Sequence, residues 1–561
     1  MQPGVIVLKF GGSVLTDEER LRMAVHEIYR WRREGWRIVA VVSAFAGRTD
    51  ELFVGATRER IAADPHAVAA MLSCGERESA ARLSISLDRV GLPAVVLDPA
   101  AIKLSATGPE LDATPTGFDA SVLRDVLDTQ GVVVVPGFIA LDAVGRIVTL
   151  GRGGSDLSAL VLAQGLNADR CRLIKDVDGL YEHDPASDGP PPDRYECVSY
   201  DDALKLDGSI VQHKAIRFAR LHELEFEVGS LNATAPTRVG RVVSRTTGTR
   251  TLQSPRRVAI LGLGTVGGGV VELLAQIPGR FQIAGTAARD PASHASLCRR
   301  LGMALPKRDA SAVACCGADI VIEAIGGVEA ARDAIAAALR DGAHVVTANK
   351  AVLARHGREL FAVAETCQRR LLASASAGGG MPVLEAVKRR EAIQVRAVLN
   401  GTANYVLHRV SEGASVDAAV LEAQRLGLAE ADPARDLDGR DSLDKLHVLA
   451  SHCGIVPIRV EREHADVRSS TPGQLRRQVA TLDRHGTLRV TLEHPDGDDP
   501  LAKLPDEWNA AEITGADGMT TFLRGRGAGR WPTAEAVLAD VFELERQGQT
   551  DQVLPRSVAL A

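Results

Sequence analysis

The stretch from Arg256 to Leu274, RRVAILGLGTVGGGVVELL, joins an apolar run to a helical pattern through closely spaced glycines. Gly262, Gly264 and Gly267 have the spacing G-x-G-x-x-G and stand between an expected strand and an expected helix. Glycines at these positions allow a tight turn and a close approach of the backbone to a pyrophosphate, which then faces the unpaired N–H groups of the helix. The stretch therefore predicts a Rossmann-type unit that binds a dinucleotide. The alternative is a tight turn without a ligand.

The residues after the next expected strand bear on which dinucleotide is bound. In FQIAGTAARD, residues 281–290, the strand is followed by Arg289 and then Asp290. An arginine at this point can bind a 2′-phosphate, whereas an acid binds the free ribose hydroxyls. Arg289 favours NADP, and Asp290 leaves NAD open as the alternative.

Continuous apolar runs bounded by glycine occur in both halves of the chain, as in GVIVLKF at 4–10 and ADIVIEAIGG at 318–327. Such runs predict strands buried on both faces of a mainly parallel sheet. The 561 residues exceed what one core accommodates, so we expect at least two domains. Residues 232–257 are rich in Thr, Arg and Ser, which is typical of a boundary. We therefore expect an α/β domain over residues 1–245, a linker over 246–255 and a second α/β part beyond it.

The composition limits the classes of binding partner that we expect. The net charge is −6 with acids and bases interspersed, so we expect no nucleic-acid partner. No apolar run reaches the length of a membrane span, and the first residues do not resemble a secretion signal, so we expect no membrane partner and a cytoplasmic location. Eight cysteines without a Cys-x-x-Cys pair predict reduced, buried thiols and no protein metal site. Small molecules remain as partners.

Polar residues of the second half gather in two places. Lys350 follows an expected strand, at the edge where doubly wound sheets bind ligands. Asp441 and Lys445 stand four residues apart on an amphipathic helix, so their side chains share one face. An acid cluster comprising Glu430, Asp432, Asp436 and Asp438 precedes them. In isolation the Asp441–Lys445 pair would be a solvated salt bridge, but its setting favours a catalytic couple.

This half resembles homoserine dehydrogenase. The similar stretches are ILGLGTVGGGV, GAHVVTANKAVLA, SAGGGMPVLEAV, NGTANYVL, AEADPARDLDGRDSLDK and LRGRGAGRWPTAEAVLADV, and they keep the family's order. The resemblance implies reduction of L-aspartate 4-semialdehyde to L-homoserine. It implies a Rossmann domain over 256–385 that is closed by 515–561, an α+β substrate and dimerisation domain over 386–514, and a homodimer or higher homo-oligomer.

The resemblance also assigns roles. Hydride transfer to the aldehyde leaves an alkoxide that needs a cation and a proton. Lys445 would donate that proton, and Lys350 would orient substrate and cofactor. Glu430 and Asp441 would hold the substrate's ammonium group, with Thr402 beside them. Cofactor contacts would come from Thr265, Val266 and Gly527, besides the glycine motif, Arg289 and Lys350. Ser374 stands where the family usually has a glutamate near a monovalent cation, so we leave a bound Na⁺ or K⁺ open.

In the first half, Lys9 stands near the end of an expected strand and is followed by a turn at Gly11 and Gly12. This arrangement can bring one positive charge to a phosphate, although the stretch is not a Walker A loop. The stretches VSAFAGRTDEL, GERES, VPGFIAL, TLGRGGSDLSA and KDVDGLYEHDP follow. Together they resemble the amino-acid kinase superfamily and, within it, aspartate kinase. The resemblance implies an αβα domain that phosphorylates L-aspartate from ATP and Mg²⁺, giving 4-phospho-L-aspartate.

The roles implied by this second resemblance are as follows. Lys9, Gly11 and Gly12 would lie at the phosphates, and Asp176 and Tyr181 at the nucleotide. Arg152 would pair with a carboxylate of aspartate, a planar fork suiting two oxygens. Asp156 would bind the ammonium group. The remaining substrate residues would be Ser43, Thr49, Glu76, Phe138 and Ser155.

Three interpretations stay open at this point. The first is a bifunctional aspartate kinase and homoserine dehydrogenase, lacking ACT regulatory domains and therefore not inhibited by threonine or lysine through them. The second makes the first half a binding module without turnover, which suits Ala186 where the family often has an arginine after Asp-Pro. The third gives the kinase another acid, such as glutamate or a carbamate.

Overall fold

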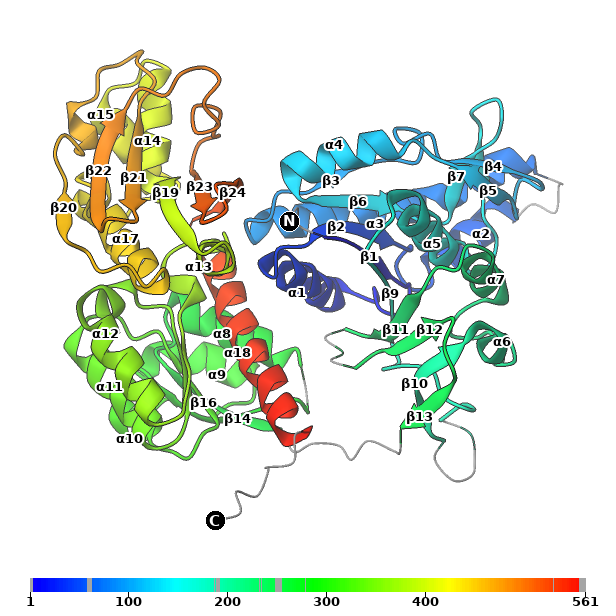
Figure 1. Ribbon diagram of the computed structural model, residues 1–561, viewed down its shortest axis with the longest axis horizontal. Coiled ribbons are helices and arrows are strands. Elements are labelled where there is room, and N and C mark those ends of the chain that lie inside the picture. The colour runs from blue at the N-terminus through cyan, green and yellow to red at the C-terminus, as the bar shows by residue number, and fades with distance from the viewer. Residues whose placement is uncertain are drawn as a thin grey trace. The chain divides into compact units, whose positions relative to one another are not determined.

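The computed structural model describes residues 4–57, 63–185, 187, 192–231, 233, 235–247, 255–277, 279–527 and 529–553 (Figure 1). They form two compact units, one containing residues 4–88 and 93–247 and the other residues 89–92 and 255–553. Both units are α/β, as the glycine-bounded apolar runs predict. None of the described helices has the length and hydropathy of a membrane span.

The first unit is built on a nine-stranded sheet with the order β13-β10-β12-β11-β9-β1-β2-β6-β3. Only the β11–β12 and β10–β13 pairs in it are antiparallel. β13 extends two residues into the predicted linker. The strands of this sheet are β1 (Val5–Phe10), β2 (Arg37–Val42), β3 (Val95–Val96), β6 (Val132–Pro136), β9 (Arg170–Lys175), β10 (Arg194–Ser199), β11 (Phe226–Ser230), β12 (Thr237–Gly240) and β13 (Arg245–Thr247).

Helices cover this sheet because its central strands are apolar on both faces. Val5 and Val7 of β1 share a core with leucines of α4 and α5, whereas Ile6 and Leu8 are fully buried on the opposite face. A small sheet adds β4 (Ser105–Thr107), β5 (Thr114–Gly117), β7 (Ile139–Leu141) and β8 (Ile147–Thr149). The helices are α1 (Glu18–Arg33), α2 (Arg48–Thr57), α3 (Pro65–Arg89), α4 (Ala120–Gln130), α5 (Gly154–Leu166), α6 (Tyr200–Ala203) and α7 (His213–Leu221).

The second unit begins with a parallel five-stranded sheet of order β15-β14-β16-β17-β18. Helices α10 to α12 lie on one face, and α8 and α18 pack together on the other (Figure 1). The strands are β14 (Arg256–Leu261), β15 (Phe281–Ala287), β16 (Ile320–Glu323), β17 (His344–Thr347) and β18 (Leu371–Leu372). The helices are α8 (Thr265–Ala275), η1 (Ala292–His294), α9 (Ala295–Arg300), α10 (Ala310–Ala314), α11 (Glu329–Arg340), α12 (Lys350–Thr366), η2 (Ser374–Ser376) and α18 (Arg530–Val553).

A six-stranded sheet of order β20-β22-β21-β19-β23-β24 completes this unit, antiparallel except for the β20–β22 pair. Its strands are β19 (Ala392–Val398), β20 (Arg459–Glu461), β21 (Arg477–Asp483), β22 (Thr487–Glu493), β23 (Trp508–Gly515) and β24 (Thr520–Arg526). Its helices are α13 (Val383–Arg389), α14 (Gly401–Ser411), α15 (Val416–Arg425), α16 (Ala434–Leu437), α17 (Arg440–His452) and η3 (Val467–Ser469).

Two expectations from the sequence need correction. We expected the chain to return to the Rossmann sheet at residue 515, but β24 pairs with β23, so the return follows Arg526. We also expected every thiol to be buried. All eight cysteines are free, but Cys74 on α3 and Cys315 after α10 are exposed. An alanine-rich or mixed helical segment does not reveal which of its faces meets solvent.

Candidate active sites

In the first unit the chemistry-bearing residues lie at the carboxyl ends of adjacent strands. β1 lies between β2 and β9, so the chain order reverses at this strand. Ligands of open α/β sheets bind in the crevice outside such a point. Lys9 belongs to β1, Lys175 ends β9, and Ser43 follows β2.

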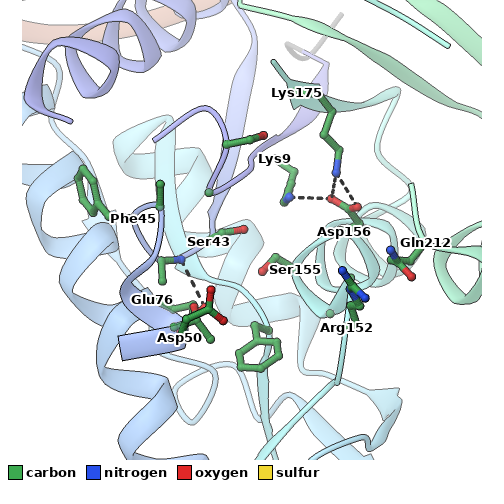
Figure 2. A pocket seen from close by; sticks show the side chains of 18 of the residues that line it. Lys9, Ser43, Phe45, Asp50, Glu76, Arg152, Ser155, Asp156, Lys175 and Gln212 are labelled. Carbon is green, nitrogen blue, oxygen red and sulfur yellow. Dashed lines mark hydrogen bonds and ion pairs between the residues drawn. The ribbon is translucent and has the colours of Figure 1, made fainter. Parts of the chain in front are cut away.

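A cavity of about 470 Å³ opens at these strand ends (Figure 2). It brings together nine of the residues singled out from the sequence: Lys9, Gly12, Ser43, Thr49, Glu76, Phe138, Arg152, Ser155 and Asp156. It also includes residues that we did not single out, among them Ser13, Phe45, Asp50, Lys175 and Gln212. The carboxylates of Glu76 and Asp50 lie on one side of the cavity, Arg152 and the two lysines lie on the other, and Ser155 lies between the two sides.

Three predicted residues lie outside the cavity lining. Gly11 adjoins it, since a Cβ on Gly11 would lie 3.2 Å from Nζ of Lys9. Asp176 accepts a hydrogen bond at 3.0 Å from Ser13, which does line the cavity. The Tyr181 hydroxyl donates to Asp178 at 2.6 Å.

Asp156 is the centre of a buried charge cluster. Nζ of Lys9 lies 2.7 Å from Oδ1 of Asp156, and Nζ of Lys175 lies 2.8 Å from Oδ2. Burial lowers the pKa of Lys9 to about 8, against the attraction of Asp156. The two lysines hold the pKa of Asp156 low although burial opposes this. Both oxygens of Asp156, to which the resemblance assigned a substrate ammonium group, therefore already contact a lysine. Its charge is already matched by two cations.

Lys175 is the functional candidate that the sequence analysis missed. The position of Lys175 could have indicated it. Lys175 ends the buried strand β9, which pairs in parallel with β1, so it reaches the same sheet edge as Lys9. The cluster of two lysines and one aspartate carries a net positive charge, which suits a phosphate.

Backbone geometry and packing require glycine at two positions of the stretch LGRGGSD. Gly151 and Gly153 have φ values of +67° and +74°, which favour glycine. A Cβ on Gly151 would lie 2.0 Å from Oδ1 of Asp112, and one on Gly153 would lie 2.4 Å from Cγ of Gln212. These contacts set the turn that begins α5 and brings the N-terminus of that helix to the cavity, where its unpaired N–H groups favour an anion.

Glu76 is a buried acid on the opposite side of the cavity. It is 3% exposed, its Oε1 accepts the N–H of Ala44 at 3.3 Å, and its Oε2 has no partner in the described part of the chain. Burial raises the pKa of Glu76 to about 7. A buried acid with a free oxygen that lines a cavity is suited to bind a cation.

In the second unit, the three motif glycines divide their roles. A Cβ on Gly262 would lie 2.3 Å from the carbonyl oxygen of Ala324, and one on Gly267 would lie 1.8 Å from that of Gly262. Both positions therefore need glycine for packing of the turn and of α8. Gly264, the N-cap of α8, has open space where its Cβ would be. This division fits a pyrophosphate passing over Gly264, with Thr265 exposed and Val266 half-buried beside it.

Two further strand ends border the same edge. Glu323, fully buried at the end of β16, accepts the N–H of Ile325 at 2.9 Å and is bonded by the hydroxyl of Thr347 at 2.5 Å. Asn349 caps α12 and donates to the carbonyl of Gly327 at 2.8 Å. Lys350 is therefore held at the N-terminus of α12. Arg289, after β15, is exposed and free to meet a ribose substituent.

Lys350 and Lys445 meet at Asp441. Helical spacing predicts the contact of Asp441 with Lys445 but not the contact with Lys350. Lys445 Nζ lies 2.8 Å from Asp441 Oδ2, and Lys350 Nζ contacts Oδ1. Burial lowers the pKa of Lys445. Burial also acts to lower the pKa of Lys350, but the attraction of Asp441 outweighs it, so the pKa of Lys350 is raised. The two lysines hold the pKa of Asp441 far below its ordinary value although burial opposes them. Two lysine ammonium groups thus lie side by side at one buried carboxylate.

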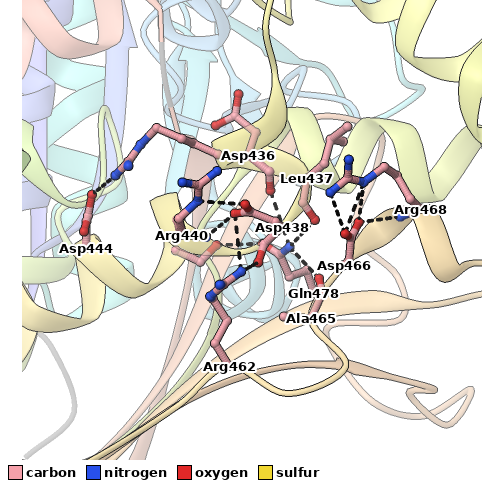
Figure 3. Close-up of polar contacts among 12 residues, drawn as sticks. Asp436, Leu437, Asp438, Arg440, Asp444, Arg462, Ala465, Asp466, Arg468 and Gln478 are labelled. Atoms are coloured by element: carbon pink, nitrogen blue, oxygen red, sulfur yellow. Dashed lines mark hydrogen bonds and ion pairs between the residues drawn. The ribbon is translucent and has the colours of Figure 1, made fainter.

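The short helix α16 carries Asp436 and is fixed from outside the lysine cluster. Asn400 donates to Asp436 at 2.7 Å and to Asp441 at 2.8 Å. The buried amide of Gln478 donates to the carbonyls of Leu437, at the end of α16, at 3.2 Å and of Ala465 at 3.0 Å (Figure 3). Helix α16 therefore has a defined position. Burial raises the pKa of Asp436.

The comparisons with known proteins agree with this arrangement. The NAD binding domain model of homoserine dehydrogenase matches residues 262–374, and the homoserine dehydrogenase model matches residues 382–542. A homoserine dehydrogenase of Synechocystis sp. is 36% identical over 321 residues, which cover 51% of this chain and 73% of that protein. The chain belongs to the homoserine dehydrogenase family.

The first unit has relatives of another kind. The amino acid kinase family model matches residues 4–225. An aspartokinase of Pseudomonas aeruginosa is 33% identical over 227 residues, which cover 40% of this chain and 55% of the aspartokinase. The chain thus spans about half the length of that relative. A solved homoserine dehydrogenase from Thiobacillus denitrificans has 31% identity and a TM-score of 0.49, covering 54% of this chain and 76% of that one. By the family models, this chain carries an amino acid kinase domain followed by the two homoserine dehydrogenase domains.

Three residues that the homoserine dehydrogenase resemblance assigned lie apart from the lysine pair. Glu430 is exposed, and among the described residues its carboxylate makes no contact with Asp441 or the lysines. The Thr402 hydroxyl donates to the carbonyl of Leu428 at 2.6 Å. Gly527 packs on Asn509, because a Cβ there would lie 1.7 Å from its Nδ2. Asp436, known from the sequence only as one of an acid cluster, takes the place beside Asp441.

The remaining predictions concern cations and one residue outside the described ranges. The Ser374 hydroxyl contacts Glu385 and lies 2.6 Å from Oδ1 of Asp540, so two acids surround it. Within the described ranges no group of three or more His, Cys, Asp or Glu side chains could hold a metal ion. Ala186 lies outside the described residues.

Proposed function

We propose that the chain catalyses two reactions, the phosphorylation of L-aspartate by ATP and the reduction of L-aspartate 4-semialdehyde to L-homoserine. One observation supports both: each unit has a buried aspartate bound by two lysines, at the strand edge where its fold binds ligands. Both reactions develop negative charge on oxygen, which such lysines stabilise.

In the dehydrogenase unit, the open space over Gly264 and the exposed Arg289 would hold the cofactor, and Arg289 favours NADP over NAD. The bound nicotinamide supplies the hydride. Lys445 donates a proton to the aldehyde oxygen, because its third N–H is free after the bonds to Asp441 and Leu399. Lys350 adds a second positive charge. Asp441 fixes both lysines, and Asp436 binds the substrate's ammonium group.

In the kinase unit, Lys9 and Lys175 neutralise charge on the transferring phosphoryl group, aided by the N-terminus of α5 and by Mg²⁺ that accompanies ATP. Asp156 holds the two lysines apart at a fixed distance. Arg152 pairs with the α-carboxylate of aspartate, and Glu76 binds its ammonium group. The side-chain carboxylate then points toward the lysines as nucleophile. We place Ser43, Thr49, Phe138 and Ser155 around the substrate, and Asp176 and Tyr181 toward the nucleotide.

The first experiment tests the kinase unit. Purified protein is incubated with MgATP and L-aspartate, and hydroxylamine traps the acyl phosphate as a hydroxamate. Hydroxamate that requires aspartate and is lost in Arg152→Ala supports the proposal. Arg146→Ala, an exposed arginine bonded to Asp142, is the matched control and should keep the activity. If no hydroxamate forms while homoserine is oxidised, the first unit is a binding module without turnover.

The other acid acceptors are distinguished in the same assay. A cavity with Arg152 and Glu76 facing each other across it complements an α-amino acid, which a carbamate is not. Replacing aspartate by glutamate tests the longer side chain, which would bring its carboxylate past the lysine pair. Equal hydroxamate from glutamate would replace aspartate as the substrate in this proposal.

We further propose that these reactions serve the synthesis of lysine, threonine and methionine in the cytoplasm. The family membership and the resemblance to aspartate kinase support this. The resemblance to homoserine dehydrogenase supports a homodimer or higher homo-oligomer through the six-stranded sheet. Sedimentation equilibrium of the full chain would test that assembly state, and a monomer would exclude it.

A further inference from the structure

The ammonium group of Lys445 is held by a backbone carbonyl as well as by Asp441. Its Nζ lies 2.6 Å from the carbonyl oxygen of Leu399, and the side chain is 9% exposed. Leu399 follows β19 and precedes Asn400, the N-cap of α14 that also donates to Asp441. The peptide around Leu399 and Asn400 therefore sets the direction of two of the three N–H donors of Lys445.

A second donor reaches the same carbonyl. Nδ2 of Asn509, on β23, lies 2.9 Å from the Leu399 oxygen. Asn509 is fully buried, and its own oxygen has no hydrogen-bond partner in the described part of the chain. A carbonyl oxygen has two lone pairs, so one donor fixes the direction in which the other lone pair points. With Asn509 on one lone pair, the other points at Lys445.

Asn509 is itself held by the segment that returns from β24. Gly527 packs so closely on it that any Cβ would collide with the amide. Close packing against Gly527 therefore limits the space open to the Asn509 side chain. A buried amide that leaves its own oxygen unsatisfied is unfavourable unless another requirement holds it there.

We propose that Asn509 is a positioning residue for the reaction: it orients the Leu399 carbonyl, and through this carbonyl the proton-donating Lys445. This inference rests on the proposed dehydrogenase function. Asn509 does not touch substrate or cofactor. It acts by keeping the proton donor within reach of the aldehyde oxygen, where an error of about 1 Å in placement can cost about 100-fold in rate.

The chain offers a matched control in Asn404. This asparagine is also buried, its oxygen also lacks a partner, and its Nδ2 also donates to backbone carbonyls, at 2.7 Å to Asp506 and 2.9 Å to Trp508. Those carbonyls do not bind Lys445. Asn509→Leu and Asn404→Leu therefore remove equivalent amides, and only the first removes one that acts on the lysine.

The experiment compares both variants with the unchanged protein in homoserine oxidation from pH 6 to 10, with thermal unfolding of each. Asn509→Leu should lower kcat by about 10- to 100-fold, with KM for NADP changed less than about twofold. The limb of its pH profile that reports Lys445 should move, because the lysine has lost a fixed acceptor. Asn404→Leu should lower Tm by a similar amount without these changes in rate. Equal kcat values and superimposable profiles for the two variants would overturn the proposal.

A second measurement does not require turnover. Trace acetylation of the lysines across the same pH range, read by mass spectrometry, reports the titration of Lys445 directly. A shift in Asn509→Leu that is absent in Asn404→Leu supports the positioning role even if homoserine is not the substrate. If neither variant shifts, the role is excluded whatever the enzyme does. If the unchanged protein does not oxidise homoserine at all, the proposed dehydrogenase function is rejected instead.

Discussion

Lys9 and Lys175 contact one carboxylate, that of Asp156, although 166 positions of the chain separate the two lysines. Parallel pairing of β1 with β9 brings them to one edge of the sheet. The charge of Lys175 lowers the pKa of Lys9, because two like charges close together favour loss of a proton. The Lys9 pKa of about 8 reflects burial first and then the opposing effects of Asp156 and Lys175.

Lys175→Met should therefore change the kinase reaction in two ways. Loss of one positive charge at the phosphoryl group should lower kcat by about 100- to 1000-fold. Loss of the neighbouring charge should raise the pKa of Lys9, so the alkaline limb of the pH profile should move upward from about pH 8. The hydroxamate assay measures both. Lys103→Met, at an exposed pair with Asp119, is the control and should leave rate and profile unchanged.

Glu76 should make aspartate binding depend on pH. Its folded pKa of about 7 lies above the ordinary value, so the carboxylate that binds an ammonium group is fully formed only above that pH. KM for aspartate should rise about tenfold per pH unit as pH falls from about 6 to 5, and level off above about 7.5. In Glu76→Gln the KM should be high and independent of pH. A pH-independent KM in the unchanged protein would remove Glu76 from the substrate site.

Lys445→Met should affect one activity and spare the other. Removing the proton donor should lower kcat for homoserine oxidation by about 100- to 10000-fold. The hydroxamate assay on the same preparation should be unchanged, since the lysine lies in the other compact unit. Parallel loss of both activities would indicate misfolding and not catalysis, and circular dichroism would show it.

Alanine substitutions at two of the motif glycines should affect cofactor binding and thermal stability differently. Gly264→Ala adds a methyl group to open space, so Tm should stay within about 2 °C while KM for NADP rises at least tenfold. Gly267→Ala places a Cβ against the carbonyl of Gly262, and such overpacking costs about 1–3 kcal/mol or more. Its Tm should fall by several degrees. Equal Tm losses in the two variants would contradict the assignment of Gly264 to the pyrophosphate.

Much of this arrangement could be predicted from short stretches of sequence. Glycine-bounded apolar runs predict the parallel sheets, and G-x-G-x-x-G predicts the turn before α8, because each depends on neighbours within a few residues. The spacing of Asp441 and Lys445 predicts their contact for the same reason.

The contacts made across the fold could not be predicted in this way. Asp156 has the local features of a substrate ligand, and only the pairing of β1 with β9 shows that two lysines occupy it. Asp436, and not Glu430, lies beside Asp441 because α16 is held there by Asn400 and by Gln478 of β21. The sequence around Asn509 does not indicate its proposed role, because that role depends on Leu399, 110 residues away.

The last helix has a consequence for how the protein is made. α18 packs along α8 on the face of the five-stranded sheet that would otherwise be exposed. During synthesis, the kinase unit can fold once its last strand has left the ribosome, near residue 247. The cofactor unit must wait, with an apolar face open, until the ribosome has translated α18, some 300 residues later. A truncation that removes α18 should therefore give soluble kinase activity attached to an aggregation-prone remainder.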